Sequence, residues 1–142
     1  MKPALVFVYG TLKRGHRNNY ILATSRFVGE GVTVAKCRLF DSGFPVLRKG
    51  SEHYKEQNAP VQGEVFLVDS EVVMYKLDQL ESEGRMCHRR TKMIRLDNGR
   101  TVRANTYVGD TKFWRSRRVR LYDLQGPQYS WPRWEHRGFA EL

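Results

Sequence analysis

The chain has 142 residues, of which 40% are hydrophobic and 28% charged, and its formal net charge is +10. A chain of this length buries one hydrophobic core, so we expect one domain over residues 1–142 and favour a monomer. The longest apolar run, residues 4–9, is much shorter than a membrane span, and no charged leader with an apolar segment precedes it. We therefore expect a cytoplasmic protein. Cys37 and Cys87 form no pattern typical of zinc ligands, so no metal site is predicted.

The first predicted element is a strand over residues 4–9, which stops at a polar turn that contains glycine. Gly10 has no Cβ, so a ligand can approach the chain closely there, and the amides of Gly10, Thr11 and Leu12 can point at one anionic group. The turn is therefore a candidate binding loop. The alternative is an ordinary strand exit, and the pattern alone does not decide between the two.

Short elements follow this turn. Residues 18–23 predict one helical turn, and the strand-like runs 32–40 and 44–47 predict a hairpin because they flank Asp41-Ser42-Gly43. The polar residues 50–60 predict a loop.

A helix is predicted over residues 69–81, with Asp69 as its N-cap and with Val73, Leu77 and Leu80 at the spacing of one apolar face. Glu81 follows Leu77 by four residues, which places its carboxylate beside that face and in the last turn. The helix dipole and partial burial both disfavour a charged carboxylate there. Glu81 is therefore a candidate base, and a solvated carboxylate at a helix end is the alternative.

A second hairpin is predicted from residues 91–96 and 101–108, which flank Asp97-Asn98-Gly99. Together these elements indicate a mixed α+β fold with a mainly antiparallel sheet, able to curl into a small barrel, and few short helices. The tail over residues 126–142 is rich in aromatic residues, so we expect it to pack back on the domain, in the core or as a rim over the site.

The positive charge is concentrated in residues 85–120, where twelve Lys and Arg residues face two Asp residues. This segment therefore accounts for the whole net charge of +10. Phe113, Trp114 and Tyr122 lie among these cations. Such a segment attracts polyanions, so nucleic acid, an acidic protein or an acidic substrate are candidate partners. The alternative is a solvated basic face without a partner.

Residues 5–15, together with residues 61–66 and 77–82, resemble the gamma-glutamylcyclotransferase-like family, most closely its gamma-glutamylamine cyclotransferase branch. The resemblance covers roughly residues 4–108 and implies the small barrel fold of that family. It also implies a transferase- or lyase-type cyclisation that converts a small γ-glutamyl substrate to 5-oxoproline and a free amine.

The resemblance gives the matching residues their roles. The backbone of Tyr9, Gly10, Thr11 and Leu12 would hold the γ-glutamyl group, and Glu81 would accept a proton from the substrate's α-amino group. Because that amine is itself the nucleophile, no metal or organic cofactor is required. The competing hypothesis is a non-catalytic relative of the same fold that uses its basic face, residues 85–120, to bind nucleic acid or an acidic protein.

One position departs from the family's pattern. The family commonly has a tyrosine where this sequence has Cys87, and the match resumes at Arg89. His88 takes that place if the loop is one residue longer. We expect Cys87, Arg89 and Tyr107 to line the pocket, although a structural role for Cys87 and His88 and a core position for Tyr107 are the alternatives.

Overall fold

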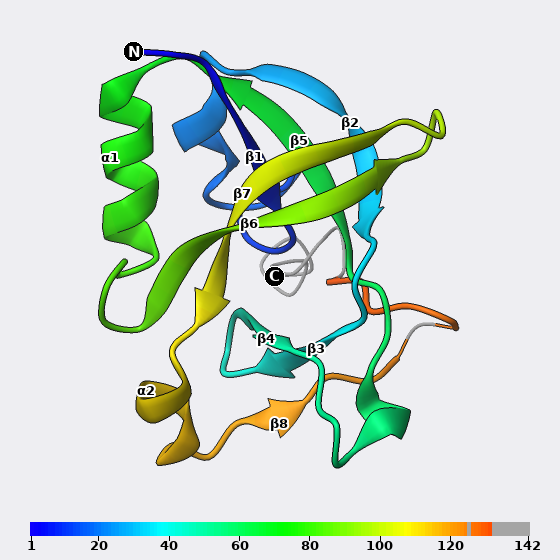
Figure 1. Cartoon of the computed structure of the whole chain (residues 1–142). Helices are drawn as coiled ribbons and strands as arrows, with labels where there is room; N and C mark the ends of the chain where they lie inside the picture. The colour runs from blue at the N-terminus through cyan, green and yellow to red at the C-terminus, as the bar shows by residue number, and fades with distance from the viewer. Residues whose placement is uncertain (125, 132–142) are drawn as a thin grey trace, which may run out of the picture.

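The computed structural model describes residues 1–124 and 126–131, and it contains two sheets (Figure 1). Five strands close into a barrel in the order β1-β5-β2-β6-β7. They are β1 (Ala4–Val8), β2 (Arg26–Thr33), β5 (Gln62–Val68), β6 (Cys87–Leu96) and β7 (Thr101–Gly109). Three strands form a smaller sheet in the order β4-β3-β8. They are β3 (Cys37–Asp41), β4 (Pro45–Lys49) and β8 (Arg120–Leu121).

The helices are short. They are α1 (Glu71–Leu80), α2 (Thr111–Arg115) and two 3-10 turns, η1 (Asn19–Leu22) and η2 (Lys55–Gln57). The predicted fold class, a mixed α+β domain with a barrel and few helices, is confirmed. Within the described residues, no helix combines the length and the apolar character that crossing a bilayer would need.

The barrel closes where β1 meets β7. This pair is parallel and short, with Val6 opposite Asn105, whereas the other neighbouring strands of the barrel run antiparallel. Side chains of β7 complete the seam: Asn105 Nδ2 donates to the carbonyl of Leu5 at 3.1 Å, and Thr106 Oγ1 donates to that of Phe7 at 3.0 Å. Polar side chains thus satisfy backbone carbonyls that would otherwise be buried without a partner.

Strand β1 divides the core because its side chains alternate between two faces. Val6 and Val8 pack with Leu77 of α1, while Phe7 belongs to the cluster inside the barrel. Tyr9 continues the second face beyond the end of the strand. The chain therefore leaves β1 with a buried tyrosine and enters the polar turn directly.

Helix α1 begins one residue later than predicted. Ser70, not Asp69, is the N-cap, because its side chain accepts the hydrogen bond from the Val73 amide at 3.3 Å. Val73 and Leu77 are buried as expected, whereas Leu80, the third residue of the predicted apolar face, is 41% exposed. The helix ends at Leu80, and Glu81 is its C-cap.

Both predicted hairpins are present, as β3–β4 and β6–β7. The expected run over residues 32–40 was wrong in its extent, because Val32 and Thr33 pair within the barrel and the second sheet starts at Cys37. Residues 34–36 turn the chain between the sheets, where Thr33 Oγ1 donates to the Ala35 carbonyl at 2.8 Å. The expected helical turn over residues 18–23 is confirmed by η1, and the expected loop over residues 50–60 contains η2.

The end of the described chain packs on the domain, as predicted. Tyr129 is fully buried in the barrel's cluster, and Trp131 lies against Tyr122 with ring centroids 5.2 Å apart. Residues 132–142, with Pro132 and Trp134, lie outside the described residues.

Candidate active site

The turn after β1 and the end of α1 line one cavity of about 200 Å³. Tyr9, Gly10, Thr11 and Leu12 all line it, and Glu81 does so from the α1 side. The two motifs that the sequence separates by about seventy residues thus meet at one cavity. Further lining residues come from the other elements around it: Phe7, Val8, Arg17, Asn18, Phe44, Pro45, Leu80, Met86, Cys87 and Tyr107.

Glu81 has the protonation behaviour of a base. Burial raises the pKa of its carboxyl from 4.5 to about 7, because the protein around it replaces water that would solvate the charge. A carboxyl with this pKa is about half ionised at neutral pH. It can therefore both take up and release a proton.

The local chain fixes the position of Glu81. Its amide donates to the Leu77 carbonyl at 3.0 Å, and the next residue, Ser82, adopts a left-handed conformation with φ of 49°. The Ser82 carbonyl then accepts from the amides of Arg85 and Met86, each at 3.0 Å. This tight loop turns the chain from α1 into β6 and brings Cys87 to the same cavity as Glu81.

Cys87 does not have the properties of a nucleophile. Burial, followed by the negative charges of Glu81 and Asp110, raises the pKa of its thiol to about 12. The thiolate is the reactive form of cysteine, so this side chain stays protonated at neutral pH. Cys87 therefore contributes to the shape of the cavity as a small, weakly polar group.

The turn from Gly10 to Leu12 leaves its amides available. Within the described residues, no hydrogen bond uses the N–H groups of Gly10, Thr11 or Leu12. The turn is held instead through its acceptors: Lys13 donates from its amide to the Gly10 carbonyl at 3.0 Å, and Asn18 from its amide to the Thr11 carbonyl at 2.9 Å. These amides are thus unpaired donors beside a cavity, as an oxyanion or carboxylate site requires.

Gly10 has a second role that the sequence did not reveal. A Cβ on Gly10 would lie 2.2 Å from Cγ of Pro45, so the first residue of β4 packs directly on the turn. Its φ does not lie in the left-handed region, so the backbone conformation does not require a glycine at this position. Close packing with Pro45 is therefore one reason for a glycine here.

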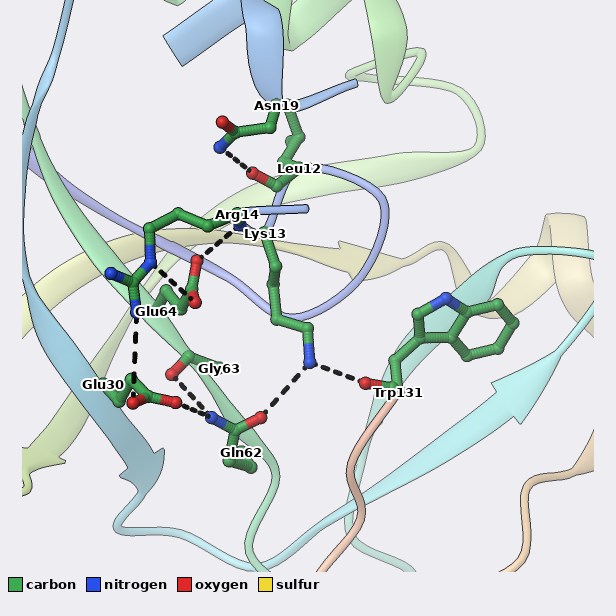
Figure 2. A network of polar contacts seen from close by, with 9 residues as sticks. All are labelled: Leu12, Lys13, Arg14, Asn19, Glu30, Gln62, Gly63, Glu64 and Trp131. Carbon is green, nitrogen blue, oxygen red and sulfur yellow. Dashed lines mark hydrogen bonds and ion pairs between the residues drawn. The ribbon is translucent and has the colours of Figure 1, made fainter. Parts of the chain in front are cut away.

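A polar network supports the far side of the turn (Figure 2). The buried carboxylate of Glu64 accepts from the amide of Arg14 at 2.8 Å and from its Nε at 3.2 Å. Lys13 Nζ donates to the Trp131 carbonyl at 2.6 Å and to Gln62 Oε1 at 3.3 Å. Strand β5 and the end of the described chain thus hold the residues that directly follow the candidate substrate loop.

Tyr107 lines the cavity and connects it to α1. The Tyr9 hydroxyl donates to the Tyr107 carbonyl at 2.7 Å, and the Tyr107 hydroxyl donates to Asp78 Oδ1 at 2.6 Å. Burial and this hydrogen bond raise the pKa of the Tyr107 phenol. The tyrosine is therefore a neutral donor that fixes the last turn of α1 against the barrel.

The remaining predicted residues lie outside the cavity. Arg89 does not line it, and its Nη1 contacts both carboxylate oxygens of Asp78 on α1 at 3.0 Å. His88 Nε2 lies 2.6 Å from Asp110 Oδ1, also outside it. Neither side chain therefore lines the cavity that contains Glu81.

Phe44 and Pro45 are the main residues that sequence reasoning missed. They reach the cavity only because the β3–β4 hairpin packs against β7, and no local pattern encodes that contact. The sequence offered one signal for them: both residues directly follow the turn Asp41-Ser42-Gly43 of a predicted hairpin. Within residues 1–124 and 126–131, no group of three or more His, Cys, Asp or Glu side chains is placed to hold a metal ion.

This combination of a small closed barrel, a glycine turn after its first strand and a half-buried glutamate at the end of α1 matches a known class. Residues 6–131 match the family model described as "Gamma-glutamyl cyclotransferase, AIG2-like", and the chain belongs to this family.

Individual relatives agree with this family. The Drosophila melanogaster protein named "Putative gamma-glutamylcyclotransferase CG2811" is 33% identical over 115 residues, which is 74% of this chain and 69% of the relative. A Vibrio cholerae protein named "Putative gamma-glutamylcyclotransferase" is 41% identical over 78 residues, 54% of this chain and 61% of that protein. The crystal structure of an AIG2-like protein from Mus musculus superposes with a TM-score of 0.64 at 26% identity, covering 93% of this chain and 97% of that one.

Proposed function

We propose that this protein is a γ-glutamyl amine cyclotransferase that releases 5-oxoproline and a free amine, with Glu81 as its base. The observation that carries the proposal is the position of Glu81: it lines the same cavity as residues 10–12, whose amides are unpaired, and burial raises the pKa of its carboxyl to about 7. Membership of the cyclotransferase family supports it.

The reaction begins with the substrate's α-ammonium group. Glu81 removes a proton, and the freed amine attacks the γ-carbonyl carbon of the same molecule to close a five-membered ring. The carbonyl oxygen becomes an oxyanion, which amides from residues 10–12 stabilise through hydrogen bonds that are already in position. The bond from the γ-carbon to the leaving nitrogen then breaks.

Glu81 returns to its starting state. Two protons leave the α-nitrogen during the reaction, one before and one after the attack, and both end on the leaving amine. The carboxyl carries each of them in turn, first as base and then as acid, which suits a pKa close to neutral pH. The cavity supplies the remaining advantage by holding the amine and the carbonyl of one flexible molecule close together.

The test is Glu81→Gln, which keeps the size of the side chain and removes its ability to accept a proton. We expect release of 5-oxoproline from a γ-glutamyl alkylamine to fall by about 10²- to 10⁴-fold. Calorimetric binding of the same substrate should stay within a few-fold of wild type, since the loop amides are unchanged. Thr111→Ser, an exposed substitution outside the cavity, serves as the control.

Two results would contradict the proposal. One is a Glu81→Gln variant that turns over substrate as fast as the wild type. The other is a wild-type protein that binds no γ-glutamyl amide and forms no 5-oxoproline from any of them.

A further inference from the structure

A second hollow lies on the other side of β6 and β7 from α1. It has a volume of about 510 Å³ and lies between β4, the first residues of β6 and the connection from β7 to α2. Its lining is strongly cationic, with four Lys or Arg residues and one Asp: Arg48, Lys49, His88, Arg90, Val108, Gly109, Asp110, Thr111 and Lys112. None of these residues lines the cavity that contains Glu81.

The single carboxylate in this groove is already engaged. Oδ1 of Asp110 lies 2.6 Å from His88 Nε2, and its Oδ2 accepts from the Phe113 amide at 2.7 Å, as the N-cap of α2. These bonds lower the pKa of the carboxyl, so it is ionised at neutral pH. Its charge nevertheless leaves most of the positive charge in the groove without compensation.

Arg48 is the residue at which this imbalance is greatest. It is half-buried, and its side chain makes no hydrogen bond or ion pair with any of the described residues. Its side chain runs against β7, where a Cβ on Gly109 would lie 3.1 Å from Cδ of Arg48. Directly opposite it in the β3–β4 pair stands another arginine, Arg38. Burial and the charge of Arg38 lower the pKa of Arg48, and the charge of Asp110 offsets only part of this effect.

The strand pattern of β6 also breaks at this groove. Ile94 and Leu96 are buried on the face of β6 that points into the core, and the same face presents His88 and Arg90 six residues, or three strand periods, earlier. The paired residue Val108 supplies an apolar patch beside them. A partly buried arginine without a partner costs stability, and such costs are concentrated at binding sites.

We propose that this groove binds the phosphate groups of a small phosphorylated molecule. Guanidinium groups match phosphate oxygens in geometry and charge, and lysines add further charge. Four cations exceed what one phosphate group neutralises, so a diphosphate suits the groove better than a monophosphate. The volume of about 510 Å³ is within the range of small-molecule sites. The unpaired guanidinium of Arg48 lies in this same groove.

The experiment is titration calorimetry with pyrophosphate, ADP and inorganic phosphate at about 0.15 M salt, where diffuse surface charge is screened. We expect saturable binding of one pyrophosphate per chain and weaker binding of inorganic phosphate. Arg48→Gln and Arg90→Gln should each weaken pyrophosphate binding by roughly tenfold or more, the worth of one charge-assisted hydrogen bond. Tighter binding of ADP would identify a nucleotide as the source of the phosphates, and equal binding would identify the diphosphate alone.

Arg95→Gln is the matched control. It makes the same change of charge on the opposite face of β6, at an exposed position outside the groove, and should leave the affinity unchanged. Arg48→Gln should also raise the melting temperature without ligand and abolish the further rise that pyrophosphate gives the wild type. These two melting-temperature results together separate a binding role of Arg48 from a purely structural one. Arg90 is exposed, so Arg90→Gln tests the groove without removing a buried charge.

Three outcomes would overturn the proposal. The first is the lack of saturable binding of pyrophosphate and ADP. The second is equal weakening by Arg95→Gln, which would indicate diffuse charge. The third is binding of a single-stranded oligonucleotide much more tightly than pyrophosphate, with the loss spread over all three variants, which would assign the surface to nucleic acid.

Discussion

The raised pKa of the Glu81 carboxyl suits it to proton transfer, but it lowers the stability of the folded protein at neutral pH. In the unfolded chain it titrates with its ordinary pKa of 4.5, whereas in the folded protein its pKa is about 7. Between these two values the folded protein holds a proton that the unfolded chain has released. The free energy of unfolding therefore falls as the pH rises through this window, and above about 7 the loss is complete.

This difference predicts how the Glu81→Gln variant unfolds. Below about pH 4 both proteins carry a mostly neutral group at this position, folded or unfolded, so their free energies of unfolding should agree. At pH 8 the variant should be more stable than the wild type by on the order of 2 kcal/mol. Urea unfolding at the two pH values measures this, with Glu71→Gln at the exposed start of α1 as the control. A variant that is less stable at pH 8 would contradict the burial of this charge.

At the scale of elements, the end of α1 is fixed to the barrel by one carboxylate. Oδ1 of Asp78 accepts a hydrogen bond from the Tyr107 hydroxyl, and both of its carboxylate oxygens accept from Nη1 of Arg89. Removing the charge should therefore loosen the turn of the helix that carries Glu81.

We predict that Asp78→Asn lowers the free energy of unfolding by about 1–3 kcal/mol and lowers kcat more than it changes KM. Tyr107→Phe removes only the phenol hydroxyl and keeps the Arg89 pair, so it should cost less. Denaturant unfolding and steady-state kinetics on both variants measure the two effects. Asp78→Asn with wild-type stability and kcat would show that the helix is held elsewhere.

The contact between the glycine turn and β4 gives a second prediction for this scale. Gly10→Ala should cost about 1–3 kcal/mol, because its Cβ would overlap Cγ of Pro45. Pro45→Ala removes that atom, and the remaining Cβ lies at an ordinary distance of 3.5 Å, so the double variant should regain stability.

Activity of that double variant separates the two roles of Gly10. If stability returns and 5-oxoproline release does not, the substrate itself approaches the backbone at this position. Recovery of both would leave packing against Pro45 as the whole reason for the glycine, and costs that simply add would contradict the contact itself.

The helices and strands could largely be predicted from the sequence. The cavity at which they meet could be predicted only in part. Periodicity indicated α1, and turn residues such as Gly99, with φ of 89°, marked the hairpins. Glu81 was found because its spacing from Leu77 is local information. Phe44 was missed because its place at the cavity depends on a contact between distant segments. Most of β2 was missed because Gly29 and Gly31 interrupt its apolar pattern and its pairing partner, β5, is distant in the sequence.

At the scale of the whole molecule, part of the basic charge in residues 85–120 is used internally. Arg89 pairs with Asp78, Arg117 lies 3.5 Å above the Phe113 ring, and Arg120 contacts Asp41 at 3.9 Å. The sequence-based hypothesis of a polyanion surface over this segment remains a prediction.

It predicts retention on heparin that falls steeply with salt, since each phosphate or sulfate contact releases bound counterions. Reversing Arg115 and Arg118, both exposed, should flatten that dependence, and Arg26→Glu on β2 is the control. Elution at the same salt concentration after the double reversal would retire this surface as a binding site.

The seam between β1 and β7 also sets the order in which the molecule can form. Val6 lies opposite Asn105, so the two edges of the barrel are about a hundred residues apart in the chain. During synthesis β1 leaves the ribosome long before its second neighbour exists, and one of its edges stays unpaired until then. Pairing across such a distance is slow. The newly made chain therefore passes through an open sheet whose unpaired edge can associate with other chains. We expect chaperone dependence to end only once residues beyond Gly109 have emerged from the ribosome.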